Sequence, residues 1–97
     1  PAQNVLYRRL GWEPPTYWHI PLVVGPDGLR LAKRHGDTRV SAYRAAGVTP
    51  GRILSALART CGWLASSESV ASLADLIPRF SSDTIPHTPL VWHDSLL

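Results

Sequence analysis

The sequence lacks methionine and holds a single cysteine, Cys61, among its 97 residues. One cysteine cannot form an internal disulfide, and this scarcity is typical of a reducing, cytoplasmic compartment. No apolar run approaches the roughly 20 residues that span a membrane, and no signal-peptide pattern is present. Because Met is absent, we expect Pro1 to be a truncation boundary rather than a natural start.

Acidic residues are also few, and they are unevenly spread. The formal net charge is +3, from ten Lys and Arg against seven Asp and Glu. A segment this basic favours a polyanionic partner, either nucleotide phosphates or an RNA backbone, and the alternative is a solvated basic surface. Between residues 28 and 62 the only acid is Asp37, and the cations are Arg30, Lys33, Arg34, Arg39, Arg44, Arg52 and Arg59.

The apolar content, 44%, is enough for one small domain with a modest core. Residue spacing predicts a helix over residues 3–10 and an extended connection at 13–15. An aromatic and β-branched run predicts a strand over 17–24, buried on both faces as in a parallel sheet. Since a lone strand cannot bury both faces, either its sheet partners are missing from the chain or the segment folds locally. Trp12 and Trp63, each beside a glycine, are interpreted as core residues.

The second half of the chain predicts a helical unit. Thr38 is expected to cap a helix over 38–46, and Thr49 a second helix that begins at Pro50 and ends before Gly62. A third helix is expected over 70–77. The tail after residue 80 either packs back through Leu90, Val91 and Trp92 or stays loose. The apolar stripe predicted for the second helix consists of Ile53, Leu54, Leu57, Ala58 and Cys61.

An apolar run that ends at Gly25 leads into a loop with three cations in five residues. The turn Pro26-Asp27-Gly28 separates the run from Arg30, Lys33 and Arg34. Phosphate chemistry needs this kind of loop, because the backbone must come close and cationic side chains must follow charge that develops on moving oxygens. The loop is therefore the first candidate site.

This loop resembles the lysine-containing signature loop of class I aminoacyl-tRNA synthetases, in the form used by the glutamate and glutamine branch. The family pattern is Pro-Leu-Ile/Val, a turn with Asp-Gly, then Lys-Leu-Ser-Lys-Arg-His-Gly. The likeness covers most of residues 1–80. The matching segments here are Pro21-Leu22-Val23, Pro26-Asp27-Gly28 and Arg30-Leu31-Ala32-Lys33-Arg34-His35-Gly36, with Gly11-Trp12-Glu13-Pro14-Pro15 before them and Tyr43-Arg44, Gly47, Pro50, Leu54, Leu57-Ala58 and Gly62-Trp63 after them.

The resemblance implies that ATP, accompanied by magnesium, is a substrate. Lys33 stands at the second signature lysine, which contacts the ATP phosphates as pyrophosphate leaves, and Arg30 stands at the first. Ala32 replaces the family's serine and so lacks its hydroxyl. No cysteine pair or His-x-x-x-His spacing supports a metal site within the chain. The resemblance implies a catalytic role for Lys33 and Arg30. It implies ATP binding by Lys33 and Arg34 through their side chains and by Leu22 and Val23 through main-chain atoms.

The residues after the loop resemble the family's stem-contact segment, which docks inside the L shape of tRNA. The implied fold is mainly α with a short β element: the C-terminal end of a class I nucleotide-binding fold plus a helical segment. The resemblance therefore favours missing sheet partners for the strand expected over 17–24. We divide the chain into the end of a catalytic domain (1–37), the stem-contact segment (38–80) and an extended tail (81–97). The candidate RNA contacts are Arg39, Arg44, Arg52 and Arg59.

The expected activity of the whole protein is ATP-dependent activation of glutamate and its transfer to tRNA. The loop and the tail favour the shortened branch that glutamylates the queuosine base of tRNA(Asp), because the chain stops where a longer member would continue. The alternatives are a canonical enzyme that charges tRNA(Glu) and a basic tRNA-binding module without chemistry. We expect a monomer, a glutamate pocket mostly upstream of Pro1, and no activity from the isolated chain.

Overall fold

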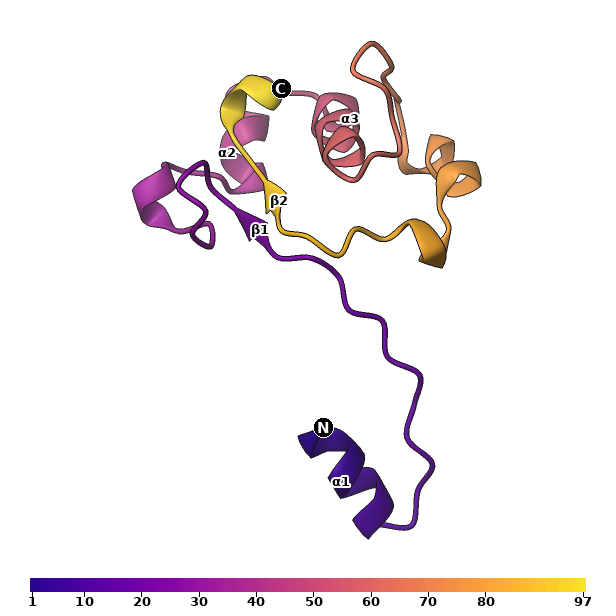
Figure 1. The fold of residues 1–97 in the computed structure, drawn as a ribbon. Helices are drawn as coiled ribbons and strands as arrows, with labels where there is room; N and C mark the ends of the chain where they lie inside the picture. Colours follow the sequence, from indigo (N-terminus) through magenta and orange to yellow (C-terminus); the bar gives the residue numbers. More distant parts are fainter.

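A computed structural model describes all residues from 1 to 97 and separates an N-terminal arm, residues 1–22, from a body, residues 23–97. The arm consists of helix α1 (Ala2–Arg9) and an extended segment, and Figure 1 shows α1 standing away from the body. The radius of gyration is 16.8 Å, whereas a compact domain of this length has about 13 Å. The predicted first helix is confirmed. The extended arm explains why the radius of gyration exceeds that of a compact domain.

The predicted strand is wrong over most of its length. Strand β1 contains only Val23–Val24, and it pairs in parallel with β2, Leu90–Val91. The preceding residues lie in the exposed arm, where Trp18 is 66% and Ile20 80% exposed, because no second strand runs beside them. One partner of the strand is therefore present, since the tail packs back onto it (Figure 1).

Two helices follow the loop. Helix α2 (Val40–Ala45) begins after Arg39, so the expected cap at Thr38 is wrong. The Asp37 carboxylate instead accepts a hydrogen bond from the Arg39 N–H at 3.1 Å, so the backbone amide just before the helix is bound by Asp37. Helix α3 (Pro50–Thr60) begins as predicted, because the Thr49 hydroxyl accepts the Arg52 N–H at 3.3 Å.

The third predicted helix is absent, and 3₁₀ turns at Leu73–Asp75 and Ile77–Arg79 take its place. The Asp75 carboxylate accepts N–H groups from Ala71 and Ser72, at 3.1 and 2.9 Å, which fixes a tight turn where a helix would begin. Pro78 then supplies no N–H to continue a helix. Apolar spacing alone did not reveal this local competition. Further 3₁₀ turns lie at Lys33–His35, Ser82–Thr84 and Asp94–Leu96.

Two small core clusters lie on opposite sides of α3. Ala56 packs with Tyr43 and Trp92, and Ala58 packs with Leu64 and Leu76. Residues two apart on a helix point in nearly opposite directions, so α3 joins the clusters. This explains why the predicted single stripe is incomplete.

Two further core predictions need correction or refinement. Ser55 is not a member of the predicted stripe, yet it is only 2% exposed, and its buried hydroxyl is satisfied by hydrogen bonds with both backbone groups of Val70. Trp12 is 61% exposed on the arm, so its assignment to the core is wrong. Trp63 does pack against the second cluster, edge-to-face with Phe80.

Gly51, in the first turn of α3, faces residues 70–71 at close range. A Cβ there would lie 2.8 Å from the Val70 carbonyl oxygen. We expect Gly51→Ala to reduce the free energy of unfolding by about 1–3 kcal/mol, although alanine is intrinsically the better helix former. Urea denaturation followed by circular dichroism measures the change, with Ser41→Ala on the exposed side of α2 as the control. A stabilised Gly51→Ala variant would contradict this packing.

None of the helices is both long and apolar enough to cross a membrane.

Candidate functional site

The cationic loop is built on a short hairpin that reverses the chain after β1. Gly25 donates its N–H to the Leu29 carbonyl and accepts the Gly28 N–H, both at 2.9 Å. Gly28 has a φ of +76°, which a residue with a side chain rarely adopts. Arg30 then lies antiparallel to Val24. The strand thus fixes where the loop begins.

Lys33 opens the 3₁₀ turn Lys33–His35 and is fully available to a ligand. Its side chain makes no ion pair and no hydrogen bond, and the residue is exposed. Its carbonyl accepts the Gly36 N–H at 3.1 Å, which closes the turn. The backbone of Lys33 is therefore held while its ammonium group stays free.

Arg34, the neighbouring cation, is used differently. Its guanidinium donates to the Asp27 carboxylate at 3.4 Å and to the Arg30 carbonyl at 3.2 Å. These bonds brace the loop across the hairpin, although the side chain is still 51% exposed. Arg30 makes no side-chain bond and is exposed. Of the loop's three cations, Lys33 and Arg30 are free, and Arg34 is engaged.

A cavity of about 670 Å³ lies beside the loop. Lys33 and Arg39 both contribute to its lining, so positive charge comes from the 3₁₀ turn and from the start of α2. Arg30 and Arg34 are not among its lining residues. The lining residues are Leu31, Ala32, Lys33, Gly36, Asp37, Thr38 and Arg39.

Asp37 and Arg39 form an ion pair at the rim of this cavity. The Arg39 Nη2 atom lies 2.6 Å from Asp37 Oδ2, and the Arg39 side chain is 78% exposed. The hydrogen bonds from the Arg39 side chain and backbone lower the pKa of Asp37 from 3.8 to about 2. The only acid in the basic segment is therefore ionised and partly neutralised at neutral pH.

We expect the carboxyl carbon of Asp37 to titrate near pH 2 in a ¹³C NMR experiment. A pKa below the unfolded value means that this ion pair stabilises the fold above about pH 4 and that the contribution is lost as the pH falls towards 2. Arg39→Ala should move the Asp37 midpoint back towards 3.8. The Asp27 midpoint, held low by His35 and the Leu29 N–H, should not move. An unchanged Asp37 midpoint in this variant would assign the shift to another cause.

Leu22 and Val23 use their carbonyl groups within the fold. The Leu22 oxygen accepts the Leu90 N–H at 2.9 Å, and the Val23 oxygen accepts the Leu31 N–H at 3.4 Å. An adenine contact at these residues must therefore share an occupied acceptor or use an N–H group. Their role in ATP binding stays a prediction.

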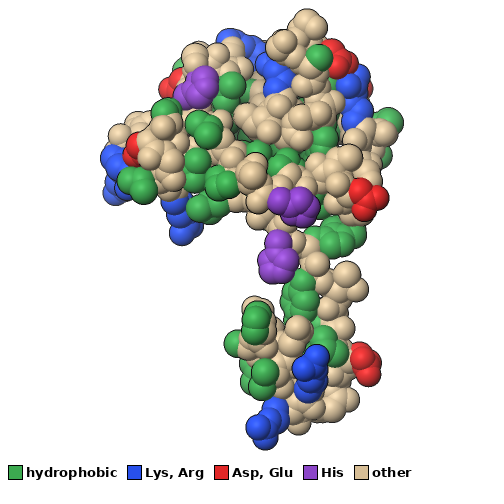
Figure 2. Space-filling view, viewed as in Figure 1, with side chains coloured by type: hydrophobic (Ala, Val, Ile, Leu, Met, Phe, Trp, Pro, Cys, Tyr) green, Lys and Arg blue, Asp and Glu red, His purple; other side chains and the backbone are tan.

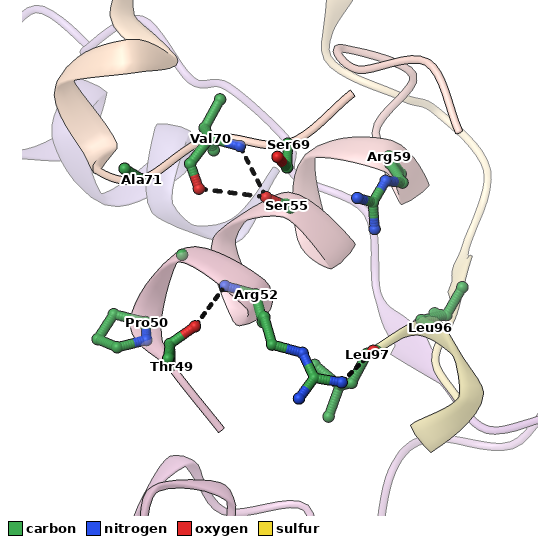
Figure 3. A pocket seen from close by; sticks show the side chains of 11 residues that line it. Thr49, Pro50, Arg52, Ser55, Arg59, Ser69, Val70, Ala71, Leu96 and Leu97 are labelled. Atoms are coloured by element: carbon green, nitrogen blue, oxygen red, sulfur yellow. Dashed lines mark hydrogen bonds between the residues drawn. The ribbon is translucent and has the colours of Figure 1, made fainter. Parts of the chain in front are cut away.

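The four candidate RNA-binding arginines are not equivalent. Arg59 donates twice to the Glu68 carbonyl, at 3.2 and 2.7 Å, and so ties α3 to the following loop. Arg52 donates to the Leu97 carbonyl at 2.6 Å, as Figure 3 shows. Arg39 is paired with Asp37, and only Arg44 makes no side-chain bond. Arg44 is thus the member whose charge is least compensated.

The distribution of charge also separates these arginines. Figure 2 shows Lys and Arg in separate groups around the visible face of the body rather than in one stripe. A second cavity, of about 490 Å³, is lined by residues of α3 that include Arg52 and Arg59, by residues 69–71 and by the end of the chain (Figure 3). Both guanidinium groups beside it bind backbone carbonyls. RNA contact by Arg39, Arg44, Arg52 and Arg59 stays a prediction.

Asp27 connects the hairpin turn to the 3₁₀ turn through hydrogen bonds that residue spacing did not predict. Its carboxylate accepts the Leu29 N–H at 3.0 Å and lies 2.7 Å from His35 Nε2, in addition to bonding Arg34. These bonds lower the pKa of Asp27 to about 2, with the His35 bond as the largest cause. The sequence does show an Asp-Gly turn at residues 27–28, seven residues before Arg34. That pattern predicts the turn but does not reveal that Asp27 binds His35 and Arg34.

No group of three or more His, Cys, Asp or Glu that could hold a metal occurs in the chain.

A braced, Gly-bounded loop that presents a free lysine beside a cavity lined by Lys33 and Arg39 is of the kind that suits contact with phosphate groups. Comparison with known families gives the particular class. The chain belongs to the class I tRNA synthetases (E and Q), and the model of their catalytic domain matches residues 1–92.

The chain is similar to curated members of this family from several bacteria. It is 37% identical to the glutamate–tRNA ligase of Dichelobacter nodosus over the whole chain and 21% of that protein. It is 38% identical to glutamate–tRNA ligase 2 of Halorhodospira halophila, over the whole chain and 20% of that protein. It is 43% identical to the glutamyl-Q tRNA(Asp) synthetase of Symbiobacterium thermophilum, over 93% of the chain and 28% of that protein. The chain thus spans between a fifth and just over a quarter of these relatives.

The predicted family is therefore confirmed, as is a fold with mostly helical elements and a short β element. The matched region crosses residues 37 and 80, where we divided the chain. That division and the C-terminal placement stay predictions.

Proposed function

We propose that the protein containing this chain activates glutamate with ATP and transfers it to tRNA in the cytoplasm. The free ammonium of Lys33, on a turn whose backbone is fixed and beside a cationic cavity, is the observation that carries the proposal. Relatives named as glutamate–tRNA ligases support glutamate as the amino acid.

Lys33 would act on the phosphates of ATP. Adenylate formation joins the glutamate carboxylate to the α-phosphorus and expels pyrophosphate, so negative charge moves onto the leaving oxygens. A lysine with a flexible stem and no internal partner can follow that charge, and it stabilises the transition state more than the bound substrate. Arg39, which also lines the cavity, would add positive charge while Asp37 holds its orientation.

The roles proposed for Arg30 and Arg34 follow from whether their side chains already make hydrogen bonds within the chain. Arg30 is exposed without a partner and would reach the outer phosphates or tRNA. Arg34 has donors beyond those it gives to Asp27 and Arg30, but its first role is to brace the loop. Magnesium would enter with ATP as part of that substrate, and no residue of this chain is proposed to hold it.

The proposed acceptor is the queuosine base of tRNA(Asp). The support is the similarity to a glutamyl-Q tRNA(Asp) synthetase over 93% of the chain and the form of the loop from Arg30 to Thr38. The second candidate is tRNA(Glu), which is favoured by the greater number of glutamate–tRNA ligases among the relatives. Arg44, as the arginine without an internal partner, is the first proposed tRNA contact.

A charging assay on the full-length protein distinguishes these functions. Radiolabelled glutamate and ATP are supplied with tRNA(Glu), with tRNA(Asp) that carries queuosine, and with tRNA(Asp) that lacks it. Labelling of the queuosine-containing tRNA(Asp) alone supports the first acceptor, and labelling of tRNA(Glu) supports the second. Salt-sensitive tRNA binding without any labelling would instead favour a non-catalytic RNA-binding module.

A further inference from the structure

The His35 imidazole is packed against the start of the hairpin. Its side chain is only 9% exposed. A Cβ placed on Gly25 would lie 2.3 Å from both Cδ2 and Nε2 of the ring. Gly25 does not have a positive φ, so its backbone does not require glycine. Position 25 therefore has to be glycine because the His35 ring fills the space that a side chain would occupy.

Both ring nitrogens of His35 have defined partners. The Ala32 N–H donates to Nδ1 at 3.1 Å, and Nε2 lies 2.7 Å from Asp27 Oδ1. An amide N–H can only donate, so Nδ1 must be the acceptor and the proton of a neutral ring must be on Nε2. The structure thus selects one tautomer, in which Nε2–H donates to Asp27.

These bonds enclose the lysine turn from both ends. Ala32 is the residue before the turn, and His35 is its last residue, whose own N–H donates to the Ala32 carbonyl at 2.9 Å. The ring therefore closes a cycle between Ala32 and His35 and anchors that cycle to Asp27 in the hairpin. Lys33 lies inside the cycle, where its backbone cannot shift without breaking one of these bonds.

We propose that His35 is a positioning residue for Lys33, and that Gly25 is kept free of a side chain to admit its ring. This inference rests on the proposed function, since the role of Lys33 belongs to it. His35 contacts no substrate in this assignment: it sets the place from which Lys33 reaches the phosphates. Misplacement of a catalytic group by about 1 Å can reduce a rate by up to about a hundredfold.

A double-mutant cycle on the full-length protein tests the proposal. ATP–pyrophosphate exchange is measured with glutamate, in the presence of tRNA, for Gly25→Ala, His35→Ala and the double variant. We expect each single variant to lower kcat about tenfold or more while the KM for glutamate stays within about twofold. The double variant should be no slower than His35→Ala, because the three atoms nearest to a Cβ at Gly25 all belong to the His35 ring. Multiplied losses would mean that the residues act independently, and would overturn the proposal.

Two further variants separate positioning from a loss of folding. His35→Asn can place an acceptor near Nδ1 for the Ala32 N–H, so it should recover part of the lost kcat. Leu29→Ala, at a 55% exposed position of the same hairpin, should leave kcat within about twofold. Equal loss in His35→Asn and His35→Ala, together with lowered melting temperatures, would assign His35 a structural role only.

The ring tautomer can be tested without any activity. Long-range ¹H–¹⁵N spectra of the histidine-labelled protein, with His35 assigned from the His35→Asn variant, should show the Nε2–H form. A ring protonated on Nδ1 alone would overturn the proposal even in an active enzyme. If charging fails for every tRNA but the Nε2–H form is found, the proposed function fails while the described loop geometry holds.

Discussion

Replacing Lys33 with alanine in the full-length protein should lower the rate of glutamate activation about 10²- to 10³-fold. The reason is that the Lys33 ammonium is free, exposed and placed beside the cavity, so the charge it supplies to leaving pyrophosphate has no substitute at that point. ATP–pyrophosphate exchange measures the effect. The KM for glutamate should stay nearly unchanged, because an interaction confined to the transition state changes kcat.

Controls for this variant follow from the fold. Arg9→Ala removes an exposed cation at the end of α1 and should leave exchange within about twofold. Lys33→Arg keeps the charge but exchanges a point charge for a planar group, so partial activity is expected. The assignment would be refuted if Lys33→Ala weakened tRNA binding while activation stayed intact.

Replacing Trp92 with alanine should reduce the free energy of unfolding by about 3–5 kcal/mol. Trp92 is 6% exposed in the first core cluster, and its indole N–H donates to the Tyr43 hydroxyl at 2.9 Å. That hydroxyl donates to Asp94 at 2.6 Å, which links the tail to α2. Only nine residues of the chain are buried, so one lost aromatic removes much of the core.

Urea denaturation followed by circular dichroism measures this loss, and Trp18→Ala is the matched control. Trp18 has the same side chain at a 66% exposed position, so its removal should cost no more than about 0.5 kcal/mol. Equal effects at the two positions would show that the tail does not pack as described. Tyr43→Phe should give an intermediate loss, about 1–3 kcal/mol, because it leaves Trp92 and Asp94 without a partner.

The protonation state of Tyr43 supports this link. Burial, and then the hydrogen bond with Asp94, raises the pKa of Tyr43, so its hydroxyl remains a donor at neutral pH. The link between Tyr43 and Asp94 therefore persists at neutral pH. It also places the tail beside the lysine loop, since Trp92, Asp94 and His35 line one small cavity of about 180 Å³.

The sequence by itself determined the family, the lysine loop and the elements whose signals are local. The loop was predicted from residues 19–36, and the comparison with known families confirmed the family to which the chain belongs. Helix α3 was predictable because Thr49, Pro50 and Gly62 mark its ends with side chains and backbone properties that act within one turn.

Only the tertiary structure decided which charges are free and which segments pair. Lys33 and Arg34 are adjacent cations, yet Arg34 is bound by Asp27 seven residues away and Lys33 by nothing. Strand β1 is short because its partner is a tail segment more than sixty residues later, and only two residues of each come into register. Local spacing cannot encode such contacts, because they depend on the path of the whole chain. For the same reason the contact between Gly25 and His35 could not be predicted from the sequence. The His35 ring lies against Gly25 only once the hairpin has formed.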